Sequence, residues 1–162
     1  MKKIIGIMGP NNATTENLID AYEIGKHVAT KEYAVLTGGL NVGVQNEGLK
    51  GAKSVEGLTI GIMPFNEPDK FSEYVDIPII TNMRSGRNYI NALSSNLVIA
   101  CGIDKGTISE ISLSLVNTAK KQVILVGTID EANQLFKKID PENVYIAKNY
   151  KECIEIFDSL NI

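Results

Sequence analysis

The sequence has few of the residues that most often hold metals or form disulfides. Its 162 residues include two cysteines, one histidine and no tryptophan. Cys101 and Cys153 lack the C-x-x-C spacing of thiol metal sites, and His27 is the only histidine that could join them. We therefore expect two reduced, buried cysteines, a structural role for His27 and no metal ion held by the protein's own side chains.

Long apolar runs and excess positive charge are missing as well. No stretch approaches the roughly 20 apolar residues of a membrane-spanning helix, and Lys2-Lys3 leads directly into a short apolar run rather than a signal peptide. The formal net charge is −3 and the pI is about 5.2, so no basic field is available to recruit nucleic acid or a membrane. These features predict a soluble cytoplasmic protein that binds neither.

Short apolar runs alternate with amphipathic segments along the whole chain. Strands are predicted at 3–8, 34–37, 58–63, 77–80, 97–101, 123–126 and 144–147, and helices at 15–30, 84–94, 130–139, 150–160 and after the loop at 102–107. Continuous apolar strands separated by helices are typical of a parallel sheet covered on both faces. We predict one α/β Rossmann-like domain over 1–162, with a doubly wound, mostly parallel sheet of about six to seven strands. The irregular segment 64–76 is expected to be a lid or an interface element.

Glycines and polar residues gather where the predicted strands end. Ligands bind beyond the carboxyl ends of the strands in sheets of this kind. The candidate ligand-binding residues at these ends are Gly9, Pro10 and Asn11, then Gly38 and Gly39, then Arg84, Arg87 and Asn88, and finally Gly102, Lys105, Gly106, Thr107 and Glu110.

The segment from Gly102 to Glu110 carries the strongest of these signals. It joins a buried strand to a helix, and the free amides of Gly106 and Thr107 at that helix start are expected to hold a phosphate or another anion. Thr107 and Glu110 also have the spacing of a capping box, in which Thr107 is the N-cap and Glu110 returns to its amide. Both interpretations remain open, and neighbouring positive charge favours the ligand site.

Arg84 and Arg87 are three residues apart at a predicted helix start, so they share a helix face. Cations at that end oppose the helix dipole. We therefore expect a ligand-binding role for both, with Arg87 exposed and contributing little to stability. The alternative is a salt bridge at the surface or between subunits.

Several common enzyme motifs do not occur. The first loop has Gly6 and Gly9 but no G-x-G-x-x-G fingerprint, and the sequence contains no G-x-x-x-x-G-K-[ST] loop. No serine occupies a nucleophile elbow. Dinucleotide-dependent oxidoreductases, P-loop NTPases and serine hydrolases are therefore disfavoured.

Several short segments of the sequence together resemble the SLOG superfamily, which includes the Lonely Guy phosphoribohydrolases. They are Thr37-Gly38-Gly39, the segment from Leu58 to Pro64, Arg87-Asn88, and Gly106-Thr107-x-x-Glu110. The hydrolases carry R-K followed further along by P-G-G-x-G-T-x-x-E. An ungapped comparison places their arginine on Arg87 and their glutamate on Glu110. The chain departs from that pattern where Asn88 replaces the lysine, Gly102 replaces the proline, and Ile103 and Asp104 replace two glycines.

The resemblance is closer to the branch that contains the molybdenum cofactor carrier proteins. It rests on Gly9-Pro10, on Arg87-Asn88 and on the segment from Leu93 to Ala100. This resemblance implies a homo-oligomer, a tetramer more than a dimer, that binds, stores and carries the molybdenum cofactor through the phosphate and pterin of molybdopterin. Molybdoenzymes or cofactor-insertion proteins would be its recipients.

Two other functions stay open. One is hydrolysis of cytokinin-type nucleoside monophosphates with Arg87 and Glu110 as catalytic residues, and the other is nucleotide sensing. Because Asn88 and the altered loop weaken the case for hydrolysis, we favour binding without catalysis.

Overall fold

The computed structural model describes residues 1–116 and 121–162. The strands are β1 (Ile4–Met8), β2 (Ala34–Thr37), β3 (Thr59–Met63), β4 (Ile77–Ile80), β5 (Leu97–Cys101), β6 (Gln122–Val126) and β7 (Val144–Ala147). The helices are α1 (Thr15–Thr30), α2 (Gly43–Lys53), α3 (Arg87–Ser94), α4 (Lys105–Leu115), α5 (Asp130–Ile139) and α6 (Tyr150–Ser159), with 3₁₀ turns η1 (Pro68–Lys70) and η2 (Arg84–Gly86). No helix in these ranges is both long and apolar enough to cross a bilayer.

All neighbouring strands of the sheet are parallel, and their order is β4-β3-β2-β1-β5-β6-β7. The chain builds outward from β1 to β4, crosses back through α3, and continues on the other side of β1 with β5. The direction of winding therefore reverses between β1 and β5. In doubly wound sheets a crevice for ligands opens beyond the carboxyl ends of the strands at this point.

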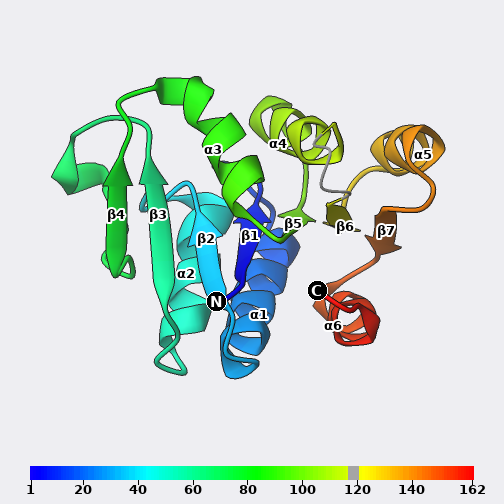
Figure 1. Cartoon of the computed structure of the whole chain (residues 1–162), viewed down its shortest axis with the longest axis horizontal. Helices are drawn as coiled ribbons and strands as arrows, with labels where there is room; N and C mark the ends of the chain where they lie inside the picture. The colour runs from blue at the N-terminus through cyan, green and yellow to red at the C-terminus, as the bar shows by residue number, and fades with distance from the viewer. Residues whose placement is uncertain (117–120) are drawn as a thin grey trace.

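Two apolar layers cover the sheet, one on each face. Figure 1 shows α1, α2 and α6 on one face and α3, α4 and α5 on the other. Alternate residues of β5 divide between them: Leu97 and Ile99 belong to the core under α1, α2 and α6, whereas Val98 and Ala100 belong to the core under α4 and α5. Because both faces are buried, the central strands are apolar throughout.

The predicted architecture is confirmed, and its strand ranges agree with the structure to within one residue at each end. Hydrophobic periodicity does not delimit α2, because its glycines interrupt the apolar pattern. The predicted helix at 84–94 begins with the 3₁₀ turn η2. Arg84, its first residue, has a φ of 49°, which lies outside the α-helical region, and α3 begins only at Arg87. Cys101 and Cys153 are free and buried, as expected.

Glycines allow α1 and α2 to pack with their backbones in contact. A Cβ atom added to Gly25 of α1 would collide with the carbonyl oxygen of Gly48 in α2, and one added to Gly51 would collide with the carbonyl oxygen of Tyr22. Glycine inside a helix costs about 0.5–1 kcal/mol relative to alanine. The close approach of the two helices is what makes these glycines necessary.

Gly25→Ala should therefore destabilise the protein, because neither backbone can yield without separating the helices. We expect a loss of about 1–3 kcal/mol, equal to a fall in melting temperature of roughly 2–4 °C per kcal/mol, measured by thermal unfolding. Gly86→Ala is the matched control, since its new Cβ would lie 3.5 Å from Met83, an ordinary contact. An unchanged melting temperature for Gly25→Ala would show that the helices are not locked together in this way.

Candidate functional site

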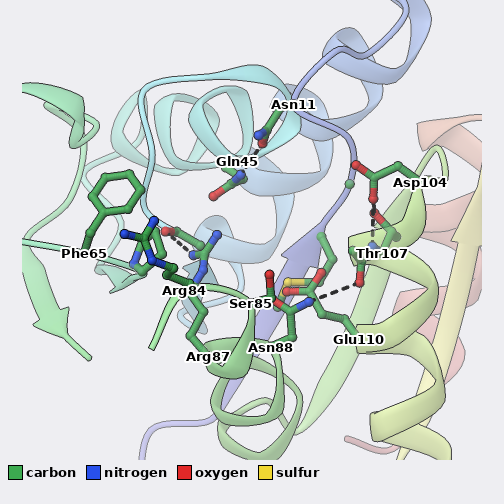
Figure 2. Close-up of a pocket in the computed structure, with 15 residues that line it drawn as sticks. Asn11, Gln45, Phe65, Arg84, Ser85, Arg87, Asn88, Asp104, Thr107 and Glu110 are labelled. Carbon is green, nitrogen blue, oxygen red and sulfur yellow. Dashed lines mark hydrogen bonds between the residues drawn. The ribbon is translucent and has the colours of Figure 1, made fainter. Parts of the chain in front are cut away.

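A pocket of about 290 Å³ lies at the carboxyl ends of the central strands, where the winding reverses. Figure 2 shows its side chains arriving from several elements and pointing toward a common space. The lining residues are Met8, Gly9, Asn11, Gly38, Gln45, Pro64, Phe65, Arg84, Ser85, Arg87, Asn88, Asp104, Gly106, Thr107 and Glu110.

Most of the candidate residues predicted from the sequence line this pocket. They are Gly9, Asn11, Gly38, Arg84, Arg87, Asn88, Gly106, Thr107 and Glu110. The other four, Pro10, Gly39, Gly102 and Lys105, lie outside the lining. The Pro10 carbonyl accepts from the amide of Val44, Gly39 packs against Met63, and Gly102 faces Asn17 of α1. The strand-end rule finds the correct edge of the sheet but not the direction that each residue faces.

Arg87 is buried, and this corrects the expectation of an exposed cation at a helix start. Only 9% of its surface is exposed. Its Nη1 donates to the carbonyl oxygens of Gly38 and Ile62, the latter at 2.6 Å. Burial lowers the pKa of Arg87, and the nearby Glu110 carboxylate opposes that shift. Arg87 therefore joins the ends of β2 and β3 to α3 as well as lining the pocket.

The amino terminus of α4 is capped by Asp104, so the alternative interpretation, a capping box with Thr107 as N-cap, is wrong. The Asp104 carboxylate accepts from the Thr107 amide at 2.8 Å and from the Thr107 hydroxyl at 2.9 Å. An aspartate before a helix is among the best N-caps. One of the two amides expected to hold an anion is therefore already satisfied by the protein's own carboxylate.

Glu110 lies on α4 at the inner side of the pocket and is 8% exposed. Its Oε1 accepts from Nδ2 of Asn91 at 2.7 Å, so it does not return to the helix start as a capping box requires. Burial raises the pKa of Glu110 to about 7, while Asn91 and Arg87 act in the opposite direction. The carboxyl group can therefore either accept or donate a hydrogen bond near neutral pH.

Arg84 lies at the opposite end of the pocket and is exposed. Its backbone is in the left-handed region, with a φ of 49°, and its amide donates to the carbonyl oxygen of Pro64 at 2.9 Å. This turn places Ser85 in the lining and lets α3 begin at Arg87. An arginine in this strained conformation beside a pocket fits the ligand-binding role predicted for it.

Six lining residues were missed by the sequence reasoning. They are Met8, Gln45, Pro64, Phe65, Ser85 and Asp104. Pro64 and Phe65 directly follow β3, so the strand-end rule applied to that strand would have found them. Gln45 donates to Oδ1 of Asn11 at 2.6 Å, but nothing in the sequence marks this residue of α2. Within the described ranges, no group of three or more His, Cys, Asp or Glu residues could hold a metal ion.

Glu110→Gln should make stability less dependent on pH. Because the pKa of Glu110 is raised from 4.5 to about 7, the folded state holds this proton more tightly than the unfolded chain does. The resulting stabilisation is complete below the unfolded pKa and is lost as the pH rises through 7. Relative to Glu110→Gln, the wild type should lose on the order of 3 kcal/mol between about pH 4.5 and pH 8.

Urea denaturation at a series of pH values measures this difference. Glu155→Gln, on the exposed side of α6, is the matched control. If the free energies of unfolding of the wild type and of Glu110→Gln changed in parallel with pH, Glu110 would not titrate in this range.

The comparisons with known proteins cover nearly the whole chain. The model of the SLOG cluster4 family matches residues 2–154. An uncharacterized protein of Archaeoglobus fulgidus is 37% identical over 128 residues, which are 76% of this chain and 83% of the relative.

Two solved structures are similar in both sequence and fold. The molybdenum cofactor binding protein from the phototrophic bacterium Rippkaea orientalis has a TM-score of 0.90 and 45% identity, covering 98% of this chain and 97% of that one. The molybdenum cofactor carrier protein from Chlamydomonas reinhardtii has a TM-score of 0.89 and 42% identity, covering 99% and 98%. Together with the family model, these matches confirm the resemblance found in the sequence, and the chain belongs to the SLOG cluster4 family.

Proposed function

We propose that this protein binds the molybdenum cofactor in the pocket described above, and stores and carries it. The observation that carries the proposal is the similarity over nearly the whole chain, at 42–45% identity, to proteins described as binding or carrying that cofactor. The bound species would be molybdopterin, a pterin with a phosphate group, with or without its metal.

The chemistry of the pocket supports such a ligand. Arg84 supplies an exposed cation, and amide side chains of Asn11, Gln45 and Asn88 supply neutral donors and acceptors. Small-molecule sites commonly combine a concave surface with a few polar groups that fix orientation. A phosphorylated heterocycle requires this combination of one strong anion contact and several neutral hydrogen bonds.

Phosphoribohydrolysis is not favoured. The lysine of the hydrolase pattern is Asn88, whose Nδ2 lies 3.5 Å from the carbonyl oxygen of Gly106 and carries no charge. The guanidinium of Arg87 donates to two backbone carbonyls and so holds the scaffold. Catalysis would require a group whose interactions strengthen in the transition state, and Nη1 of Arg87 is already engaged by the scaffold.

We also propose that copies of this chain associate, as a tetramer or a dimer, through the apolar surface of α3 and α4. Tyr89 and Leu93 of α3 are about half exposed, as is Ile108 of α4, and Val116 just beyond α4 is 75% exposed. The two helices are neighbours on one face of the sheet (Figure 1). Exposed apolar patches of this kind are typical of protein–protein contacts. The cytoplasmic location and the recipient molybdoenzymes or insertion proteins remain predictions.

Gly106→Leu should weaken cofactor binding without unfolding the protein. A Cβ at Gly106 meets no atom closer than 3.4 Å, so a larger side chain has room to enter the pocket. Binding of molybdopterin, measured by fluorescence titration and by mass spectrometry of copurified ligand, should fall by at least about tenfold, equal to 1.4 kcal/mol. Glu155→Leu, on exposed α6, should bind like the wild type.

Two results would contradict this function. One is unimpaired molybdopterin binding by a folded Gly106→Leu variant. The other is release of ribose 5-phosphate from nucleoside monophosphates by the wild type, lost in Glu110→Gln, which would restore the hydrolase.

Leu93→Glu should shift the molecular mass measured by light scattering to a smaller species, because it places a charge in the proposed interface. Leu135→Glu is the matched control, since Leu135 of α5 is 54% exposed and Leu93 is 49% exposed. A wild type that runs as a monomer of 17.6 kDa would rule out the association.

A further inference from the structure

Apart from Arg87, whose Nη1 donates to the carbonyl oxygens of Gly38 and Ile62, the charged side chains that line the pocket lie at opposite ends according to their sign. Asp104 and Glu110 belong to the segment that follows β5, whereas Arg84 follows β4 and lies beside Phe65, which follows β3. Because β1 and β2 separate β5 from β3 in the sheet, the two groups lie on different sides of the pocket. Figure 2 shows Arg84 and Phe65 at one side and Asp104 with Thr107 at the other.

The end beside α4 is poorly suited to an anion. The Thr107 amide and hydroxyl both donate to Asp104, so a phosphate would have to displace this carboxylate or lie against it. Glu110 adds a second carboxyl group at the same end, and the Asp104 charge raises the pKa of Glu110. Like charges held this close in a partly buried site repel. The carboxylate of Asp104 therefore already occupies part of the helix amino terminus, the position that usually favours anions.

The end beside Arg84 has the opposite character. Arg84 forms no ion pair within the described ranges of the chain. Lys70 lies nearby, with its Nζ 5.1 Å from the centre of the Phe65 ring, but Glu67 pairs with its charge, so Arg84 is the cation that this end offers to a ligand. Ser85 adds a hydroxyl to the lining next to Arg84. This end therefore offers a charge-assisted site for phosphate oxygens.

We propose that the ligand binds in one orientation, with its phosphate at Arg84 and the N–H donors of its heterocycle against Asp104 and Glu110. This inference rests on the proposed function, and it assigns phosphate recognition to Arg84 instead of to the amino terminus of α4. A pterin presents an amino group and an adjacent ring N–H on one edge, and a carboxylate can accept from both. The charge distribution of the ligand then matches that of the pocket, and the reversed orientation would place phosphate beside two carboxyl groups.

The test compares two probes, 6-hydroxymethylpterin and its phosphate monoester, by isothermal titration calorimetry. The dissociation constant of the unphosphorylated pterin, divided by that of the monoester, measures what the phosphate contributes to binding. Arg84→Gln should reduce this ratio by about tenfold or more, equal to about 1.4 kcal/mol, and leave binding of the unphosphorylated pterin within about twofold of wild type. Arg84→Lys should keep most of the ratio because it keeps the charge. Lys26→Gln, at an exposed position of α1 outside the pocket lining, controls for loss of one positive charge.

Asp104→Asn distinguishes the two orientations by its effect on the ratio of dissociation constants. Asparagine is as good an N-cap as aspartate, so the fold of α4 is kept while the charge is removed. In the proposed orientation both probes should bind more weakly by the same factor, and their ratio should not change. If phosphate bound at α4 instead, removing the carboxylate would increase the ratio.

The outcomes distinguish this proposal from the function on which it rests. The proposed orientation is supported if the ratio of dissociation constants falls in Arg84→Gln and stays unchanged in Asp104→Asn. An unchanged ratio in Arg84→Gln, or a larger one in Asp104→Asn, overturns the orientation and leaves pterin binding intact. Failure of the wild type to bind either probe overturns both.

Discussion

The site depends on the guanidinium of Arg87, which donates to the carbonyl oxygens of Gly38 and Ile62. These carbonyls lie at the carboxyl ends of β2 and β3, where parallel strands leave acceptors without partners. A buried charge is costly unless it is hydrogen-bonded, and backbone carbonyls meet that need without neutralising the charge. The contact fixes the start of α3 against the sheet, and with it the turn that holds Arg84 at the edge of the pocket.

Much of this architecture could be predicted from the sequence, because burial on both faces makes the strands apolar throughout. The pocket was also placed at the correct edge, since Asn11, Arg84 and Glu110 each follow a strand. Side-chain direction could not be predicted in the same way. Arg87 was expected to face solvent on account of the helix dipole, but the unpaired carbonyls that attract it lie 25 and 49 residues earlier in the chain.

The start of α4 shows a second limit of local reasoning. Thr107 and Glu110 have the spacing of a capping box, yet Asp104 caps the helix and Glu110 turns toward Asn91. In the sequence, Asp104 was interpreted only as a departure from the glycines of the hydrolase pattern, although aspartate is one of the residues that favour the N-cap position. The residue that weakens the match to the hydrolases thus has a structural role of its own, and it adds a charge to the pocket lining.

The edge strand β4 combines three half-exposed isoleucines with a proline. The Thr81 amide points toward β3, where it donates to Met63, so by alternation the backbone of Pro78 and Ile80 points outward. Pro78 has no N–H, which leaves Ile80 as the one outward donor of the strand Ile77–Ile80. A strand from another molecule would find too few donors to continue the sheet. This edge can therefore be apolar without becoming a template for fibrils.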